Sequence, residues 1–319
     1  MIGVDSFHEV RTLNLAQQRL LLSGRYFTAE EIKQIQETVR VFSALSWTEL
    51  LQTICEHLDW VTPTGRYKVG SCAKALQKLE GEGLVKLPDR LPGRGHQQKV
   101  VIGAQTDPEQ CLIGDVGDIA PVSVEPAIGQ SSLRLWNEYV ERYHSLGYRR
   151  PFGAHQRYFI IGGGRRLGCL MFAASAWALA ERDRWIGWTE QDRALRLNLV
   201  VANTRFLMFP WVRLKNLAST ALSLAAKRIA QDWQVRYGYA PVLLETFVDA
   251  DRYRGTSYVA ANWIRLGVTA GRGRMDRWTQ YLSTPKVIYV YPLVANFRSF
   301  LRQESNEQAK PSIAARVVE

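Results

Sequence analysis

The stretch that most constrains the fold runs from Leu197 to Arg274. Two short apolar runs, 197–202 and 242–248, flank a helix-like segment that opens at Asn216. Strand-like runs on either side of one helix predict a β-α-β unit, and such a unit needs further strands and helices to cover its two faces. We therefore predict an α/β (α+β) fold. We expect the functional site at the strand ends of this unit and in the loop after its second strand.

The chain is strongly basic, with a formal net charge of +11. A basic excess of this size favours a partner that carries phosphate. DNA is the partner we expect, because the basic residues gather beside turns and aromatic residues. The alternative is a generally basic, well-solvated surface.

Cysteine usage and hydropathy bear on the cellular setting. The four cysteines include no CxxC pair, which indicates a reducing setting without a disulfide framework or a Cys-based zinc site. No apolar run reaches the roughly 18 residues of a membrane helix, and the first ten residues lack a leader pattern. We expect a cytoplasmic protein with no membrane partner and no metal.

Residues 1–102 predict a helical, winged-helix-like domain. A short helix is expected over residues 11–22, and Thr28 with Glu31 has the spacing of a capping box that opens the next one. Two further amphipathic helices, a short strand and a basic loop complete the pattern of a winged helix-turn-helix. The alternative is a winged-helix fold used only for packing or protein contacts. The DNA contacts expected here are Arg66, Lys68, Lys74 and Arg94.

The rest of the chain divides into three parts. Residues 103–130 are rich in proline and glycine and show no periodic hydrophobic pattern, which predicts a linker or a lightly structured crossing. Residues 131–302 form the predicted α/β domain, and residues 303–319 a loose polar tail. Two apolar runs around Gly162–Gly164 predict a β-hairpin, in which the glycines form the turn rather than a phosphate loop.

Two acids in the second strand of the β-α-β unit are candidate catalytic bases. Glu245 interrupts an apolar run, where a carboxylate is either paired or part of a site, and Arg205 is its expected partner. Asp249 ends the strand, where a catalytic acid would project toward a ligand. Its alternative role is to cap the helix that follows.

Three further side chains are candidates for proton transfer: His144, His155 and Tyr258. The two histidines bracket a basic aromatic loop, and ordinary hydrogen bonding within that loop is the alternative for each. Tyr258 shares a compact loop and helix with Asn262, so the pair could stack on a base and read its edge. The alternative is a structural helix with a polar tip.

Positive charge surrounds these candidates. The expected nucleic-acid contacts in the α/β domain are Arg149, Arg150, Arg157, Arg205, Arg254, Asn262, Arg272 and Arg274. Simple solvation is the alternative for the arginines. Asn216 is a predicted N-cap, so the backbone N–H groups of Leu217, Ala218 and Ser219 form a candidate anion site for a cofactor.

Several long motifs resemble a known family. YHSLGYRRPFGAHQRYFI, GRRLGCLMFAASAW, NLVVANTRFLMFPWVRLKNLAS and PVLLETFVDADRYRGTSYVAANWIRLGVTAGRGR are similar to the DruA-like family of the Druantia anti-phage system. The resemblance covers most of the chain. It implies a setting in anti-phage defence or a mobile element, with other defence-system proteins as partners, and it supplies no settled chemistry.

A second resemblance covers about the last 130 residues. Strand, helix opening with NLAS, acid-ended strand and GTSYVAANW are similar to the Mom-type DNA-modification proteins of the GNAT fold. This resemblance implies a mixed-sheet, GNAT-like domain, an acyl-CoA-like donor and transfer of a small group to a nucleobase. The usual GNAT phosphate loop is absent between Val201 and Asn216, which leaves the cofactor open. The alternative is a non-catalytic nucleic-acid sensor that uses the same site.

Overall fold

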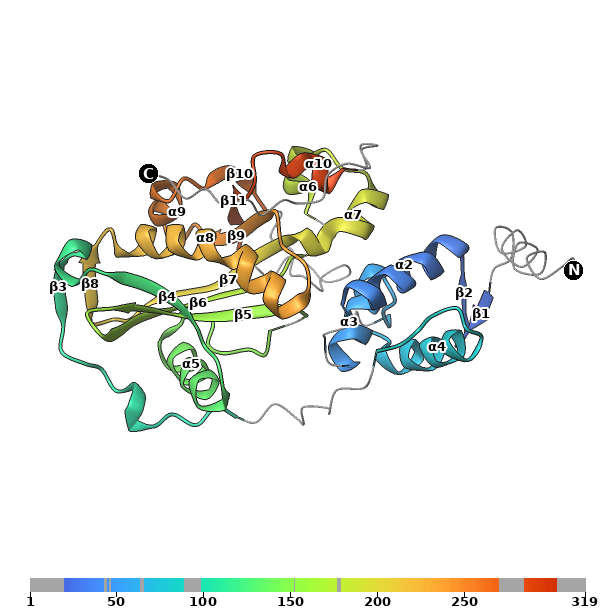
Figure 1. Ribbon diagram of the computed structural model, residues 1–319, viewed down its shortest axis with the longest axis horizontal. Helices are drawn as coiled ribbons and strands as arrows, with labels where there is room; N and C mark the ends of the chain where they lie inside the picture. Colours follow the sequence, from blue (N-terminus) through green and yellow to red (C-terminus); the bar gives the residue numbers. More distant parts are fainter. Residues whose placement is uncertain are drawn as a thin grey trace, which may run out of the picture.

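The computed structural model contains an N-terminal helical unit and a larger α/β unit, which lie side by side (Figure 1). No helix within the described part of the chain is long and apolar enough to cross a membrane. The described residues are 20–42, 45, 47–63, 66–88, 99–151, 153–176, 179–269 and 284–302.

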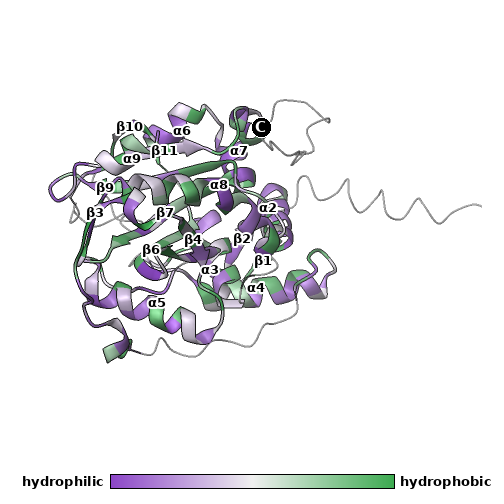
Figure 2. Cartoon of the chain, turned by 60° about the vertical axis from the view of Figure 1, so that its left-hand side comes forward, coloured by the Kyte–Doolittle hydropathy of each residue, from purple (hydrophilic) through white to green (hydrophobic). Residues whose placement is uncertain are grey.

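The N-terminal unit is built of a hairpin and helices. Its elements are β1 (Leu20–Leu22), β2 (Arg25–Phe27), α2 (Ala29–Val41), α3 (Trp47–His57) and α4 (Val69–Gly81). The predicted capping box at the start of α2 is confirmed, because Thr28 Oγ1 accepts from the Glu31 N–H and the Glu31 carboxylate accepts from the Thr28 N–H. Each helix buries one face. In Figure 2 hydrophilic and hydrophobic residues accordingly alternate along α4.

The N-terminal hairpin corrects one prediction. The helix expected over residues 11–22 is wrong for residues 20–22, which form β1; the rest of that segment lies outside the described residues. The reason is the turn, since Ser23 and Gly24 both have positive φ, as a two-residue hairpin turn requires. The short strand expected over residues 84–87 is not formed. Of the expected basic wing loop, residues 89–100, residues 89–98 lie outside the described residues, so the winged-helix topology stays a prediction.

The α/β unit is organised around a seven-stranded mixed sheet of order β10-β11-β9-β7-β6-β5-β4. In that order the strands are Ile264–Val268, Lys286–Pro292, Leu243–Asp249, Val200–Met208, Arg165–Ala174, His155–Gly162 and Val122–Pro126. The helices are α5 (Gln130–Tyr143), α6 (Ala180–Ile186), α7 (Glu190–Arg196), α8 (Leu217–Tyr237), α9 (Thr256–Ala260) and α10 (Phe297–Leu301). The short 3-10 turns are η1 (Ala104–Thr106), η2 (Val116–Ile119) and η3 (Leu197–Leu199).

The predicted β-α-β unit is confirmed. β7 and β9 lie side by side and parallel, joined by α8, whereas the other neighbouring strands of this sheet are antiparallel. The parallel pairing extends only as far as Asn203 and Thr246, although both strands continue. At the same point β7 has an irregularity opposite β6, which leaves Thr204 as an extra residue. The two central strands therefore part after Asn203.

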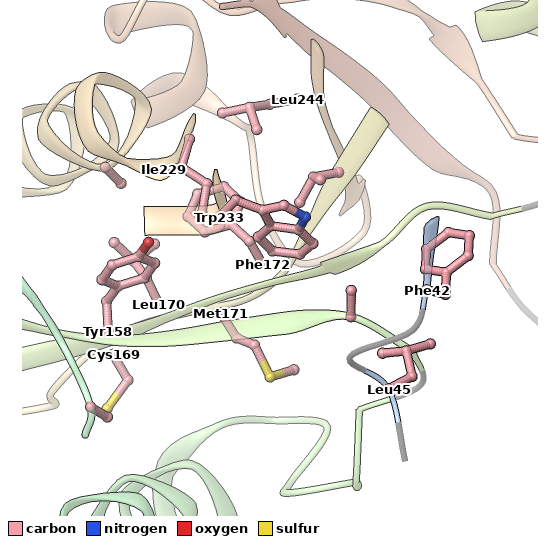
Figure 3. Packing of buried hydrophobic residues seen from close by; sticks show 14 of the residues in the cluster. Phe42, Leu45, Tyr158, Cys169, Leu170, Met171, Phe172, Ile229, Trp233 and Leu244 are labelled. Atoms are coloured by element: carbon pink, nitrogen blue, oxygen red, sulfur yellow. The ribbon is translucent and has the colours of Figure 1, made fainter. Parts of the chain in front are cut away.

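Helices cover both faces of the sheet. Neighbouring residues of a strand face opposite sides, so Tyr158, which bonds Asp232 of α8, and Phe159, which contacts Tyr139 of α5, place these helices on opposite faces. Figure 3 shows Tyr158, Phe172 and Trp233 on the α8 side. The predicted hairpin is confirmed as β5 and β6, with the glycines in its turn.

The linker predicted over residues 103–130 is wrong. This segment contains η1, η2, strand β3 (Leu112–Asp115), and β4, the edge strand of the main sheet. β3 pairs in parallel with β8 (Val212–Lys215), and β4 pairs with β5. The strands escape detection because they are four and five residues long and lie between proline and glycine. The segment belongs to the α/β unit.

The two units share a hydrophobic core. One continuous cluster of buried residues includes Phe42 and Leu45 of the N-terminal unit together with the core under α8. The rings of Phe42 and Tyr239 meet edge to face with centroids 6.2 Å apart. Figure 3 shows Phe42 and Leu45 beside the end of the sheet. These buried contacts join the two units, and we call the place where they meet the packed joint.

Candidate functional site

Glu245 is part of a buried ion pair. Its side chain is fully buried, and its Oε2 accepts from Arg182 Nη1 of α6 at 3.1 Å. The predicted pairing with Arg205 is wrong. Arg205 donates instead to the carbonyl oxygens of Gly147 and Thr204, whereas α6 brings Arg182 over the face of β9 that carries Glu245. The Glu245 carboxylate is thus paired with a buried cation, and its role as a catalytic base stays a prediction.

Asp249 lies at the end of β9 and is half-buried. It shares a face of the strand with Glu245, four residues earlier. Its Oδ1 accepts from the backbone N–H of Asp251 at 3.2 Å, and its Oδ2 lies 3.8 Å from Arg252 Nε. The side chain thus stabilises the turn after β9, while the helix α9 begins at Gly255 without a side-chain cap.

Tyr258 is buried where the two central strands part. Its hydroxyl donates to Asn203 Oδ1 at 2.7 Å, and its ring stacks on Tyr289. The Asn203 amide donates to the carbonyl oxygens of Met171 and Arg205, and Thr246 Oγ1 donates to the Asn203 carbonyl oxygen. Burial raises the pKa of Tyr258. This network holds the residues on either side of the extra residue in β7, and the expected role of Tyr258 in proton transfer stays a prediction.

His155 and Arg157 also point into the interior. The His155 imidazole lies against the carbonyl oxygen of Gly153, with Nδ1 at 3.0 Å, and its backbone N–H donates to the Tyr237 hydroxyl. The Arg157 guanidinium lies over the Trp136 ring, and its side chain is buried. Both side chains are buried, and the proton-transfer and nucleic-acid roles expected of them stay predictions.

His144, Arg149 and Arg205 form what we call the arginine cluster. His144 ends α5, Arg149 lies in the following loop, and Arg205 lies just past the parting of β7 and β9. Burial and the nearby Arg149 lower the pKa of Arg205. Burial and the charge of Arg205 lower the pKa of His144 to about 4. Since His144 Nδ1 accepts from the Leu146 N–H, the neutral ring carries its proton on Nε2.

The His144 pKa predicts a dependence of stability on pH. In the unfolded chain this histidine titrates near 6.5, so as pH falls from about 6.5 to about 4 the unfolded state takes up a proton that the folded state does not. The free energy of unfolding should therefore fall over this window. His144→Gln should lose less stability than the parent chain between pH 7 and pH 5, measured by denaturant unfolding. Equal losses in both proteins would contradict the assignment.

Other predicted contacts are spread over the surface. Arg66, Lys74, Arg149, Arg254 and Asn262 are exposed, and Lys68 and Arg150 are half-buried. Arg94, Arg272 and Arg274 lie outside the described residues. Within the described part of the chain, no three His, Cys, Asp or Glu side chains gather as metal ligands would. The residues that sequence patterns missed are Arg182, Asn203 and Thr246, since their roles depend on partners far away in the chain.

The start of α8 does not fit a cofactor pyrophosphate. Asn216 occupies the N-cap position, but its φ is +63° and its side chain donates to Asp115 Oδ2 at 3.3 Å instead of capping the helix. Leu217 is buried, and Ala218 and Ser219 are half-buried. An acid beside the first turn repels a phosphate, and residues 209–216 contain no glycine. The candidate site for an acyl-CoA-like donor is therefore not supported here.

Similar solved structures include acetyltransferases. The ribosomal L7/L12 alpha-N-protein acetyltransferase RimL is 11% identical, with 55% of this chain and 94% of that chain covered and a TM-score of 0.33. The aminoglycoside acetyltransferase AAC(6')-Ib in complex with coenzyme A is 12% identical, with coverage of 54% and 94% and a TM-score of 0.35. Such TM-scores assign no chemistry to this chain. None of the curated proteins matches it.

A family match covers more than half of the chain. Residues 104–284 match the family described as Druantia protein DruA. The matched range begins at η1, includes the central β-α-β unit and contains all three residues of the arginine cluster. The chain belongs to the Druantia protein DruA family.

Proposed function

We propose that this chain is a DNA-binding component of an anti-phage defence system and that it grips duplex DNA through the exposed side of α4. Membership of the Druantia protein DruA family supports the defence setting, in which the chain would work in the cytoplasm with other defence-system proteins. The charge of +11 supports a partner that carries phosphate.

The observation that carries the proposal is a stripe of unpaired cations on α4. The helix buries Cys72, Ala75, Leu76 and Leu79 against the core. Lys74, Gln77 and Lys78 are exposed on the other side, and Arg66 is exposed just before the helix. None of these basic groups forms an ion pair with a described residue. We call Arg66, Lys74 and Lys78 the α4 stripe. An exposed helix face with free cations suits phosphate contacts beside a DNA groove.

Group transfer to a nucleobase is less well supported. The reaction needs a catalytic general base whose side chain reaches the substrate, and it needs a site for the donor of the transferred group. Of the five predicted catalytic residues, Glu245, His155 and Tyr258 are buried in structural contacts. His144 has a pKa of about 4 and is a weak base, and Asp249 serves a turn. The non-catalytic function is therefore the one that the geometry favours.

DNA binding by the α4 stripe should depend steeply on salt. Each phosphate contact contributes about 0.9 to the slope of log K against log salt, so Lys74→Ala with Lys78→Ala should lower the slope by roughly 2. The measurement is fluorescence anisotropy with a duplex at several salt concentrations. Lys227→Ala, which removes an exposed lysine of α8, is the matched control and should leave the slope unchanged. Equal slopes for the double variant and the control would reject the proposal.

A further inference from the structure

Arg205 is a half-buried cation without an acidic partner among the described residues. Its guanidinium donates from Nη1 to the Thr204 carbonyl oxygen at 2.7 Å and from Nε to the Gly147 carbonyl oxygen at 3.2 Å. It takes part in none of the ion pairs of the described chain. Two neutral carbonyl groups compensate a partly desolvated charge only in part. The fold therefore holds the Arg205 guanidinium without the carboxylate partner that a half-buried cation usually has.

The surroundings of Arg205 add positive charge. Arg149 is exposed and close enough to oppose the charge of Arg205, and it has no hydrogen bond or ion pair with a described residue. His144 presents an Nε2–H donor, since its Nδ1 is already used by Leu146. The charges of Arg149 and Arg205 thus act on each other, the charge of Arg205 acts on His144, and the Arg149 guanidinium has no hydrogen bond to a described residue.

The loop that carries Arg149 is held in place. Gly147 adopts a φ of +58°, and its carbonyl oxygen accepts from Arg205. Glu141, the acid at this end of α5, accepts from the Tyr148 N–H at 2.7 Å, so its carboxylate is engaged by the loop backbone. The Tyr148 hydroxyl in turn accepts from Arg157 at 3.2 Å. These bonds preorganise the cluster before any ligand arrives.

The Thr204 hydroxyl is a second unsatisfied group at this place. Thr204 is the extra residue of β7, and its Oγ1 is buried without a hydrogen-bond partner among the described residues. Its carbonyl oxygen is the one that accepts from Arg205. A hydroxyl and a cation that both lack a counterpart among the described residues thus belong to consecutive residues, at the point where β7 and β9 part.

We propose that the arginine cluster binds the terminal phosphate of a nucleic-acid strand. A terminal phosphate carries a charge of about −1.5 to −2 at pH 7, which matches two guanidinium groups, whereas an internal phosphodiester carries a single charge. A terminal group also has one free side, so it can reach the half-buried Arg205. A free nucleotide offers the same group. The proposal rests on the proposed DNA binding, and it adds a second site that recognises an end.

The test compares duplexes of one sequence that carry a phosphate at the 5′ ends, at the 3′ ends or at neither. The full chain should bind one phosphorylated duplex about tenfold more tightly than the hydroxyl-ended one, as one more charge-assisted contact contributes. Arg149→Ala, which changes an exposed side chain, and Arg205→Met should remove this preference. Arg213→Ala, an exposed arginine of β8, is the matched control and should keep it.

The outcomes separate the two proposals. The double variant Lys74→Ala, Lys78→Ala should bind all three duplexes more weakly. The ratios between the three affinities should stay unchanged, because the α4 stripe does not contact the terminal groups of the duplex. If the chain binds no duplex, DNA binding fails, and the phosphate site is then tested with adenosine and adenosine monophosphate by thermal shift. Stabilisation by the monophosphate alone, lost in Arg149→Ala, identifies a free nucleotide as the ligand. Equal binding of all duplexes together with no effect of the monophosphate overturns the proposal.

Discussion

Replacing Arg182 by methionine should lower the free energy of unfolding by about 3 to 5 kcal/mol at pH 7, because it leaves a carboxylate buried without its partner. Glu245 is fully buried, and Arg182 Nη1 is the group that faces its Oε2. The other oxygen of Glu245, Oε1, has no hydrogen-bond partner among the described residues, so nothing there replaces the arginine. The measurement is urea unfolding followed by circular dichroism.

Two controls distinguish charge from packing. Glu245→Gln should cost less than Arg182→Met, since Asp183 still pairs with Arg182 at 2.8 Å. The double variant Arg182→Met, Glu245→Leu should recover much of the loss, because no buried charge remains. A double variant that is as unstable as Arg182→Met would show that lost packing, not charge, is responsible.

Trp233→Ala should lower the free energy of unfolding by about 3 to 5 kcal/mol, the cost of removing a large aromatic side chain from a packed core. Trp233 is 1% exposed, and its ring lies 5.0 Å from that of Tyr237, between α8 and the sheet (Figure 3). Trp233→Phe leaves a smaller void and should lose less. At low temperature, where the variant is still folded, its affinity for DNA should equal that of the parent, because the α4 stripe lies in the other unit. A change in stability below 1 kcal/mol would mean that the core closes around the void.

Local patterns predicted much of the fold. The capping box of α2, the hairpin of β5 and β6, and the β7-α8-β9 unit all depend on residues close together in the chain, and each is confirmed. The prediction for residues 103–130 was wrong because the strands in this segment are short and pair with strands far away in the sequence. β3, for example, pairs with β8 about a hundred residues later, and no local period records that pairing.

The candidate site was harder to predict, since side-chain type does not reveal a partner. Glu245 was recognised as a carboxylate that needs a cation, yet that cation is Arg182, 63 residues earlier, and not the nearer Arg205. Arg205 therefore has no acidic partner among the described residues. The sequence analysis did not select Asn203, because a single asparagine within a strand forms no recognisable sequence pattern. Its role follows from the parting of two strands, which only the assembled sheet shows.

The packed joint between the two units bears on how a long ligand is held. Phe42 and Tyr239 are in contact within one continuous cluster, so the units that carry the α4 stripe and the arginine cluster are joined by buried side chains. If both proposed sites bind DNA, a duplex held at one of them raises the effective concentration of its end at the other. The affinity of the chain should then increase once the duplex is long enough to reach both sites.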